Sequence, residues 1–250
     1  MILLRSRPGD AHLLRLTPGR VTVENQGVVD LSGLVGSPPG TAVAWGSRRY
    51  RAFRPSLDDL LGHLSRKAQI ILPKDAQQLL RLGGVGPGGR VAEAGAGSGA
   101  LSLVLAHAVG ASGHVLTYDR RPDFLEVTRR NLERSGLADR VDLRLRDVVA
   151  EGFDATGLDG LLLDLPEPWG ALPHARTALI PGASVGIFTP TYNQLERTVR
   201  ELRDLGFEEV RSFEFLERAL HVGEGGTRPE FDMLGHTGFL TGARWMGGPW

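Results

Sequence analysis

The 250-residue chain contains no cysteine. It therefore has no disulfide bonds, no thiolate nucleophile and no cysteine ligands for a metal ion. The histidines lack the spacing of metal ligands, and no H-E-x-x-H pattern occurs. Ser98 lies among glycines but is not the centre of a nucleophile elbow, G-x-S-x-G, because Ala96 stands two residues before it. We therefore expect no bound metal and no hydrolase chemistry.

Long apolar runs are also missing. No segment reaches the ~18 consecutive apolar residues that span a bilayer, so we expect no membrane contact. Residues 1–10 contain Arg5, Arg7 and Pro8 and lack the apolar centre of a signal peptide. Together these observations predict a cytoplasmic protein.

The chain has no net charge, since 29 basic residues balance 29 acidic ones. This balance argues mildly against nucleic acid as a partner, because proteins that bind polyanions usually carry a basic excess. The local distribution argues the other way in one place. Six basic residues fall within twenty positions and form either a solvated face or a surface for a phosphate backbone: Arg48, Arg49, Arg51, Arg54, Arg66 and Lys67.

The most informative segment that is present is the run V-A-E-A-G-A-G-S-G-A at residues 91–100. It predicts a buried strand, a glycine-rich turn and the start of an apolar helix. Glycines let the chain turn sharply and let a ligand approach bare backbone, and the following helix offers unpaired N–H groups. A turn without a ligand is the simpler interpretation, but three glycines in five residues cost backbone entropy that a plain turn need not lose.

Two cofactors fit this turn. The dinucleotide pattern G-x-G-x-x-G/A is satisfied by Gly95, Gly97 and Ala100, with Asp119 where an acid would bind ribose. The E-x-G-x-G-x-G loop of methyltransferases that use S-adenosylmethionine is satisfied equally well by Glu93 and the glycines at 95, 97 and 99.

The chain divides near residue 55. Residues 1–55 show short strand patterns at 11–16, 21–24, 28–31, 41–45 and 48–53, and no helical periodicity. Ser56 then predicts a helix N-cap, and a second helix is expected at 75–82. From residue 90 onward strands at 90–93, 114–118, 141–145, 160–165 and 184–188 alternate with helices at 99–109, 122–135, 169–179 and 194–205.

This alternation predicts an α/β domain over residues 56–250, with a mostly parallel sheet covered on both faces. Two further strands, at 208–216 and 238–245, have no helix between them and predict an antiparallel pair at the sheet edge. Five βα units followed by such a pair is the layout of the Rossmann-like methyltransferase fold. The glycine-rich pieces 83–89 and 223–226 are expected to be flexible loops.

Four consecutive strands end in or beside a carboxylate: Glu93, Asp119, Asp147 and Asp164. Ligands of such sheets bind outside the carboxyl ends of the strands. Asp119 could accept both hydroxyls of a ribose, and Asp147 an adenine amine, with the Val148 N–H beside it. Glu93 could attract a cationic group. Each acid alone could simply cap a helix, but four on successive strands favour a cofactor site.

Asp164 is the strongest candidate for chemistry. It ends the apolar run Leu161–Leu163 and is followed by Pro166, Pro168 and Trp169. A carboxylate at the end of a buried strand is costly unless it is paired or useful. An acid, rigid prolines and an indole together suit a pocket for a flat base that carries an amino group; a helix cap at Asp164 with Trp169 in the core is the alternative.

The chain resembles the tRNA (adenine-N1)-methyltransferase family, which modifies adenosine 58 in the T-loop. The resemblance covers most of the chain and rests on four segments: R-K-A-Q-I-I-L-P-K-D-A at 66–76, E-A-G-A-G-S-G at 93–99, L-D-L-P-E-P-W at 163–169 and G-H-T-G-F-L at 235–240. The combination of Q-x-x-x-P-K-D with D-x-x-x-P-W is the specific part. Two positions depart from the family: Leu72 replaces a usual Tyr, and Asp119 a usual Glu.

The resemblance implies a cytoplasmic, metal-independent enzyme of the homotetrameric bacterial and archaeal type, with S-adenosyl-L-methionine as cofactor and tRNA as substrate. Asp164 would then be catalytic. The cofactor would be held by Glu93, Gly95, Gly97, Ser98, Gly99, Ala100, Leu101, Asp119, Asp147, Val148 and Asp164.

Three alternatives stay open from the sequence. The first is an NAD(P)-dependent oxidoreductase, for which D-L-P-E-P-W after the fourth strand is a poor catalytic region. The second is a methyltransferase of small molecules or proteins. The third is a non-catalytic RNA-binding relative, which the Leu72 replacement suggests and the intact glycine loop argues against.

Overall fold

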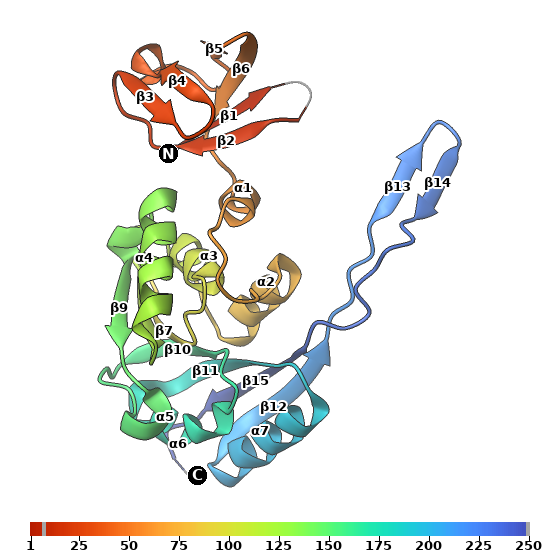
Figure 1. Cartoon of the computed structure of the whole chain (residues 1–250). Helices are drawn as coiled ribbons and strands as arrows, with labels where there is room; N and C mark the ends of the chain where they lie inside the picture. The colour runs from red at the N-terminus through yellow and green to blue at the C-terminus, as the bar shows by residue number, and fades with distance from the viewer. Residues whose placement is uncertain (7–8, 249–250) are drawn as a thin grey trace.

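A computed structural model describes residues 1–6 and 9–248 of the chain. Arg7 and Pro8, cited above against a signal peptide, lie outside the described residues. The N-terminal module is a small antiparallel sheet of order β2-β1-β6-β5 with a separate β3–β4 hairpin (Figure 1). Its elements are β1 (Ile2–Ser6), β2 (Ala11–Leu14), β3 (Arg20–Val23), β4 (Gly27–Asp30), the 3-10 turn η1 (Ser32–Leu34), β5 (Ala42–Trp45) and β6 (Arg48–Phe53).

This module has its own apolar core, which includes Leu4, Leu31, Trp45 and Tyr50. Strand β1 was not predicted from the sequence, because Ile2, Leu3 and Leu4 are all buried and the strand does not alternate. The other strand patterns are confirmed to within two residues at their ends.

A linker, made of helix α1 (Leu57–Gly62) and the segment 63–72, joins the two parts of the chain. Helix α1 begins at Ser56 with the expected N-cap, completed as a capping box in which Asp59 bonds back to Ser56. The segment 63–72 then runs to helix α2 (Pro73–Leu82), which begins two residues before the expected start because Pro73 occupies the first turn.

The large sheet has seven strands in the order β12-β15-β11-β10-β7-β8-β9. Strand β15 is antiparallel to both of its neighbours, β11 and β12, and all other neighbouring strands are parallel. The predicted mostly parallel sheet with an antiparallel pair at one edge is therefore confirmed. Its strands are β7 (Arg90–Ala94), β8 (His114–Asp119), β9 (Val141–Leu145), β10 (Leu158–Leu163), β11 (Leu179–Thr189), β12 (Phe207–Glu214) and β15 (Phe239–Trp245).

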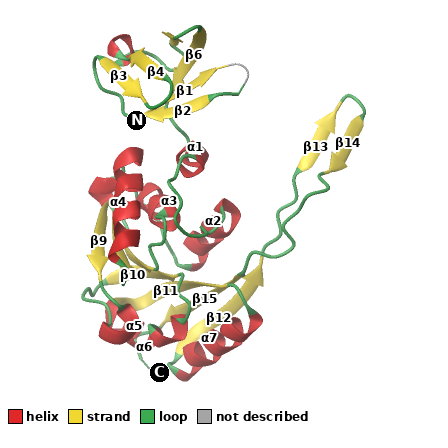
Figure 2. Ribbon diagram, in the orientation of Figure 1, coloured by secondary structure: helices red, strands yellow, loops and turns green. Residues whose placement is uncertain are grey.

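Helices cover both faces of this sheet, as Figure 2 shows. Successive side chains of the central strands enter opposite cores: Leu161 and Leu163 lie in one, and Leu162 in the other. This is why these strands are apolar on both faces. One face carries α2, α3 (Ala100–Val109) and α4 (Pro122–Ser135). The other carries α5 (Val148–Glu151), α6 (Leu172–Ala178) and α7 (Tyr192–Asp204) with the short turn η3 (Pro168–Gly170), whereas the short turn η2 (Ala138–Arg140) packs beside α4 on the first face.

One expectation about loops was wrong. Residues 223–226 are not a free glycine-rich loop but the turn of a hairpin formed by β13 (Leu220–Gly223) and β14 (Gly226–Pro229). The arm, defined here as residues 216–234, stands away from the body of the protein in Figure 1. Among the described residues, half of the exposed large apolar side chains lie in it: Leu216, Leu220, Val222, Phe231, Met233 and Leu234.

Two further observations bear on function classes. No helix in the described part of the chain is both long and apolar enough to cross a bilayer. A G-x-S-x-G match does occur at residues 182–186, but it lies inside strand β11. A nucleophile elbow needs a sharp turn from strand to helix, so Ser184 is not one.

Candidate active site

The glycine loop joins the end of β7 to α3, and each of its glycines has a positive φ. At Gly95 a β-carbon would lie 2.0 Å from the backbone oxygen of Asp164, so this glycine allows β7 and the chain after β10 to approach. Gly97 has a φ of 53°, and a β-carbon there would meet nothing within 4 Å, so this residue faces open space. Gly99 caps α3 with a φ of 81° and packs on Thr128.

Glu93 is fully buried at the end of β7. Its Oε1 accepts a hydrogen bond of 2.5 Å from the Ser102 hydroxyl, whereas its Oε2 has no partner among the described residues. Burial, and the nearby charges of Asp164 and Asp119, raise the pKa of Glu93 to about 8. The sequence analysis missed Ser102, although a serine in the otherwise apolar start of α3 is a detectable signal.

Asp119 is the last residue of β8 and faces the loop. Its Oδ2 accepts from the Gly97 N–H at 3.3 Å, and its Oδ1 accepts from the Arg121 N–H at 2.9 Å. The carboxylate thus holds the turn in place, and each oxygen keeps a lone pair for a further donor.

Asp147 lies one strand further out and caps α5. Its Oδ1 accepts from the N–H groups of Val149 and Ala150, and its Oδ2 lies 3.6 Å from Arg120. Asp147 therefore caps a helix, which is the simpler of the two roles considered for it in the sequence analysis. Val148 is the first residue of the helix, where a backbone N–H has no partner within the helix.

Asp164 follows β10 directly, and its backbone N–H bonds to the Ala94 oxygen at 2.9 Å. Its half-buried carboxylate accepts no hydrogen bond from the residues that the structure describes. Burial, and secondarily the charge of Asp119, raise the pKa of Asp164 to about 6. The predicted strand ending at residue 165 stops at Leu163, which leaves this carboxylate at the mouth of the sheet.

The loop after Asp164 is tied to α7. Gln194 donates from Nε2 to the Pro166 oxygen at 2.9 Å. The guanidinium of Arg197 lies 4.2 Å from the centre of the Trp169 ring and covers one face of the indole. The indole predicted as a stacking surface is thus already stacked on one side.

The remaining loop residues are buried. Ala100 and Leu101 are each 5% exposed and belong to the core beneath α3. The Ser98 hydroxyl accepts from the backbone N–H groups of Lys67 and Ala68 in the linker. Its side chain therefore serves the linker as well as the loop.

Lys74 forms a second tie that the sequence did not reveal. Its ammonium donates to Asp75, to the Phe215 oxygen and to the Thr237 hydroxyl, each at 2.7 Å. Phe215 and Thr237 stand at the two ends of the arm. Lys74 therefore fastens the start of α2, next to Leu72, to the base of the arm.

The basic cluster of the sequence is divided in space. Arg48 pairs with Asp10, Arg51 donates to the Gly40 oxygen, and Lys67 pairs with Asp123. Arg49 and Arg51 lie on one exposed face of β6, where Arg5 of β1 is the cross-strand neighbour of Arg51. No partner is recorded for Arg49 within residues 1–6 and 9–248.

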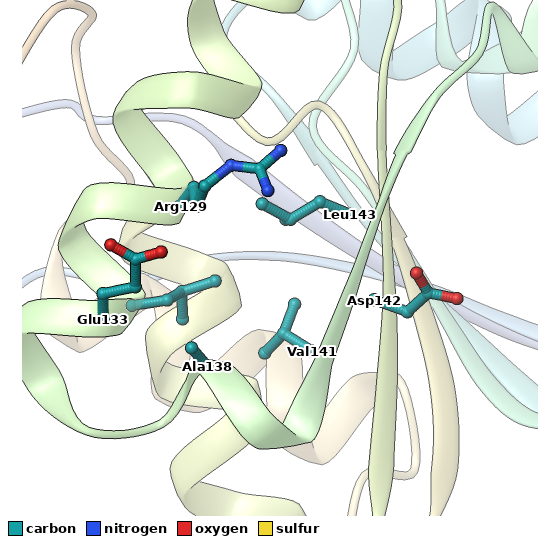
Figure 3. Close-up of a pocket in the computed structure, with 7 residues that line it drawn as sticks. Arg129, Glu133, Ala138, Val141, Asp142 and Leu143 are labelled. Atoms are coloured by element: carbon teal, nitrogen blue, oxygen red, sulfur yellow. The ribbon is translucent and has the colours of Figure 1, made fainter.

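A surface pocket lies elsewhere, away from the carboxyl ends of the strands. This pocket of about 270 Å³ lies between α4 and the first half of β9, lined by residues such as Arg129, Glu133 and Leu143 (Figure 3). Across the described ranges, no group of three or more acids and histidines is arranged to hold a metal ion.

The charges around the glycine loop discriminate between the two cofactors. A dinucleotide brings a negatively charged pyrophosphate, whereas S-adenosylmethionine brings a positive sulfonium and an ammonium. The charges of Asp164 and Asp119 add to the burial that raises the pKa of Glu93, and the charge of Asp119 adds to the burial that raises the pKa of Asp164. The unpartnered Glu93 oxygen and the open space at Gly97 fit a cationic nucleoside. The fold and this site define a methyltransferase that uses S-adenosylmethionine.

Comparison with known proteins narrows the class. A family model described as tRNA methyltransferase complex GCD14 subunit matches residues 55–227, and the chain belongs to this family. It is 34% identical to the tRNA (adenine(58)-N(1))-methyltransferase TrmI of Thermus thermophilus, over 97% of this chain and 96% of that protein.

Two further similarities cover most of the chain. The tRNA (adenine(57)-N(1)/adenine(58)-N(1))-methyltransferase TrmI of Methanocaldococcus jannaschii is 34% identical over 76% of each protein. A crystal structure of a SAM-dependent O-methyltransferase from Thermotoga maritima matches with a TM-score of 0.81 and 32% identity, over 98% of this chain and 92% of that one.

Proposed function

We propose that this protein transfers a methyl group from S-adenosylmethionine to N1 of adenosine 58 in the T-loop of tRNA. The observation that supports the chemistry is Asp164, a half-buried carboxylate beside the glycine loop that has no hydrogen-bond partner among the described residues. The TrmI relatives, one of which aligns over nearly the whole chain, support the substrate.

The cofactor is held, in this proposal, by the residues at the carboxyl ends of four strands. Asp119 accepts from the ribose hydroxyls, and Glu93 attracts the ammonium through its free oxygen. Asp147 and the Val148 N–H receive the adenine edge. The bare backbone of the loop lets the ligand approach, with contributions from Gly95, Gly97, Ser98, Gly99, Ala100 and Leu101.

Asp164 positions the acceptor. S-adenosylmethionine supplies a methyl group already activated by its sulfonium, so the protein's task is alignment. Adenine N1 has a lone pair in the ring plane and needs no base to remove a proton. Once the adenosine has left its stack, Asp164 accepts from its N6 amine and favours the positive charge that grows on the purine.

An oxygen acceptor would make a different demand. A hydroxyl group must lose its proton on methylation, which requires a positioned base. The Thermotoga neighbour is described as an O-methyltransferase, so identification of the methylated atom is part of the test below.

The N-terminal module supports an RNA substrate through its charge. Residues 1–55 contain eight arginines and no lysine against three acids, Asp10, Glu24 and Asp30, although the whole chain is neutral. A basic module beside an acidic cofactor site suits a protein that holds a phosphate backbone and a cationic donor at once. We propose residues 1–55 as an RNA-binding and assembly domain and 56–250 as the methyltransferase domain.

The arm supports an assembly of several copies. A two-stranded hairpin is marginal on its own in water, and this one exposes six large apolar side chains in the arm that carries it. Such a patch normally marks an interface. We propose that the arm is buried against other copies in a homotetramer, and that the enzyme acts in the cytoplasm.

The deciding experiment uses unmodified tRNA transcripts and methyl-labelled S-adenosylmethionine. After incubation, the tRNA is digested and the labelled nucleoside is identified. We expect 1-methyladenosine in wild-type transcripts and none in transcripts with A58 replaced by G. Label on a ribose or on another base would overturn the assignment, and label at position 57 as well would widen it.

A further inference from the structure

The linker is fastened to the glycine loop by one buried amide. Asn131, on α4, is 2% exposed. Its Nδ2 donates to the backbone oxygens of Ser65 and Ser98, at 2.9 and 2.8 Å, and its Oδ1 accepts from the Ser65 N–H at 3.0 Å. The amide thus joins the linker to the residue between Gly97 and Gly99.

Further bonds make this tie continuous. The Ser98 hydroxyl accepts from the N–H groups of Lys67 and Ala68 at 2.9 and 3.1 Å. At the other end of the linker, His63 contacts the Asp59 oxygen at 2.7 Å and the Ala11 oxygen of β2 at 3.3 Å. A path of hydrogen bonds, joined by the covalent backbone of residues 63–65, therefore runs from the N-terminal module to the loop.

The pattern has a physical consequence for the loop. Gly97 and Gly99 have left-handed backbones with no side chain to restrain them, so a plain Gly-Ser-Gly turn has many conformations to lose on binding a ligand. Bonds at both the oxygen and the hydroxyl of Ser98 remove much of that freedom beforehand. A change that orders the linker should then also order the cofactor loop, and the reverse.

We propose that Asn131 is a positioning residue that couples the linker to the glycine loop, so that tRNA held by the N-terminal module tightens the binding of S-adenosylmethionine. This inference rests on the proposed function. The side chain of Asn131 bonds only to the backbone of Ser65 and Ser98 among the described residues, so it acts through these two residues rather than on the reacting atoms.

The test uses the full-length protein and the variant Asn131→Asp. Aspartate keeps the size of the side chain and the acceptor for Ser65, but it cannot donate to the two backbone oxygens. We expect the dissociation constant and the KM for S-adenosylmethionine to rise about tenfold, with kcat for saturating tRNA changed less than about threefold, because two donated bonds to the linker and loop are lost. Ser65→Ala is the matched control, since it keeps both backbone contacts of residue 65.

Coupling is measured by titrating S-adenosylmethionine with and without tRNA. In the wild type, tRNA should tighten cofactor binding about fivefold or more, and by reciprocity the cofactor should tighten tRNA binding equally. In Asn131→Asp this factor should fall toward one. A cofactor affinity equal to that of the wild type would overturn the positioning role, and an unchanged coupling factor would overturn the coupling.

A second variant covers a failure of Asn131→Asp to fold, which thermal unfolding would show. Ser98→Ala removes the acceptor for Lys67 and Ala68 and leaves the rest of the loop intact, and it should lower the coupling factor in the same direction. If the wild type itself binds no S-adenosylmethionine, the proposed function fails; if it does and both variants match it, only the present inference fails.

Discussion

At the scale of single residues, the site gathers negative charge where water is scarce. Glu93 and Asp164 both have raised pKa values, about 8 and about 6, and burial is the first cause for each. Each carboxylate lacks a basic partner in the described part of the chain. A cationic ligand supplies the missing partner, so the free site holds protons that the bound site gives up.

This predicts pH-dependent binding. In the ligand-free protein, Glu93 stays protonated at pH values well above its ordinary pKa of 4.5. A bound cation favours the ionised carboxylate. We expect the affinity for S-adenosylmethionine to rise several-fold between about pH 6 and pH 7, with about one proton released. Calorimetry in buffers of different ionisation enthalpy measures both. Glu93→Gln should show a much weaker dependence, and a flat profile in the wild type would contradict the idea.

The stability of the ligand-free protein should change with pH in the opposite direction to the cofactor affinity. A carboxyl whose folded-state pKa is raised is most stabilising when protonated, so the ligand-free protein should lose stability as the pH rises from about 4.5 toward 8. Saturating S-adenosylmethionine should reverse this trend in thermal unfolding.

Asp164 should separate binding from turnover. We expect Asp164→Ala to lower kcat by at least about 10²-fold, a typical loss for a group that stabilises developing charge, and to weaken cofactor binding only a few-fold. Asp164→Asn should behave similarly, because an amide cannot balance a cation. Single-turnover assays with saturating cofactor, beside calorimetry, measure the two effects. Substantial activity in either variant would refute the role.

At the scale of elements, the strand-loop-helix unit around β7 and α3 combines a glycine that packs against backbone with a glycine that faces open space. A side chain at Gly95 would collide with the backbone of Asp164, whereas one at Gly97 would enter open space. The two positions look alike in the sequence. Only the packing of β10 against β7 distinguishes them.

The two glycines therefore predict different variants. Gly97→Ala should cost about 1–2 kcal/mol of stability from its left-handed backbone and should lose cofactor binding, because the new methyl group occupies the ligand's approach. Gly95→Ala should fail to fold or melt far lower. Thermal unfolding and calorimetry test both; a Gly97→Ala protein with normal cofactor affinity would show that the ligand does not lie against this residue.

Most elements could be predicted because their patterns are local. The apolar run at Leu161–Leu163, the capping Ser56 and the glycine stops all act within a few residues. The hairpin at 220–229 was missed because its strands are exposed on every residue, so they show no alternation. Strand β1 was missed because Ile2, Leu3 and Leu4 are buried in succession, so the strand shows no alternation.

At the scale of the whole molecule, the N-terminal module and the arm stand away from the large sheet (Figure 1). The module carries exposed arginines on β6, and the arm carries exposed apolar side chains. The arm is attached through Lys74 to the helix that begins beside Leu72. The proposed assembly surface is therefore joined to the helix next to the candidate site, although the arm contributes none of the four acids at the strand ends.

If the arm joins copies of the chain as proposed, removal of its hairpin should break up the homotetramer. Replacing residues 218–231 by two glycines removes the hairpin and leaves β12 and β15 paired. We expect light scattering with size-exclusion chromatography to show a smaller species that still binds S-adenosylmethionine, because the glycine loop does not touch the arm. An unchanged number of copies per particle would contradict the proposed role of the arm.

The basic face should contact phosphate. We expect Arg49→Ala with Arg51→Ala to weaken tRNA binding and to lower the salt dependence of log K by about one per residue. Arg200→Ala with Arg203→Ala, on the exposed side of α7, serves as a matched control. If the first pair binds tRNA as the wild type does, this face is merely solvated.

The sequence by itself determined the order of elements, the mostly parallel sheet and the four acids at strand ends, because strand periodicity and glycine turns depend on neighbouring residues. Only the tertiary structure decided which acids are buried without a basic partner among the described residues, which glycine faces open space, and that Asn131 joins the linker to the loop. Those properties depend on contacts between residues more than thirty positions apart, such as Ser98 with Asn131, and no local pattern encodes the free energy of such a contact.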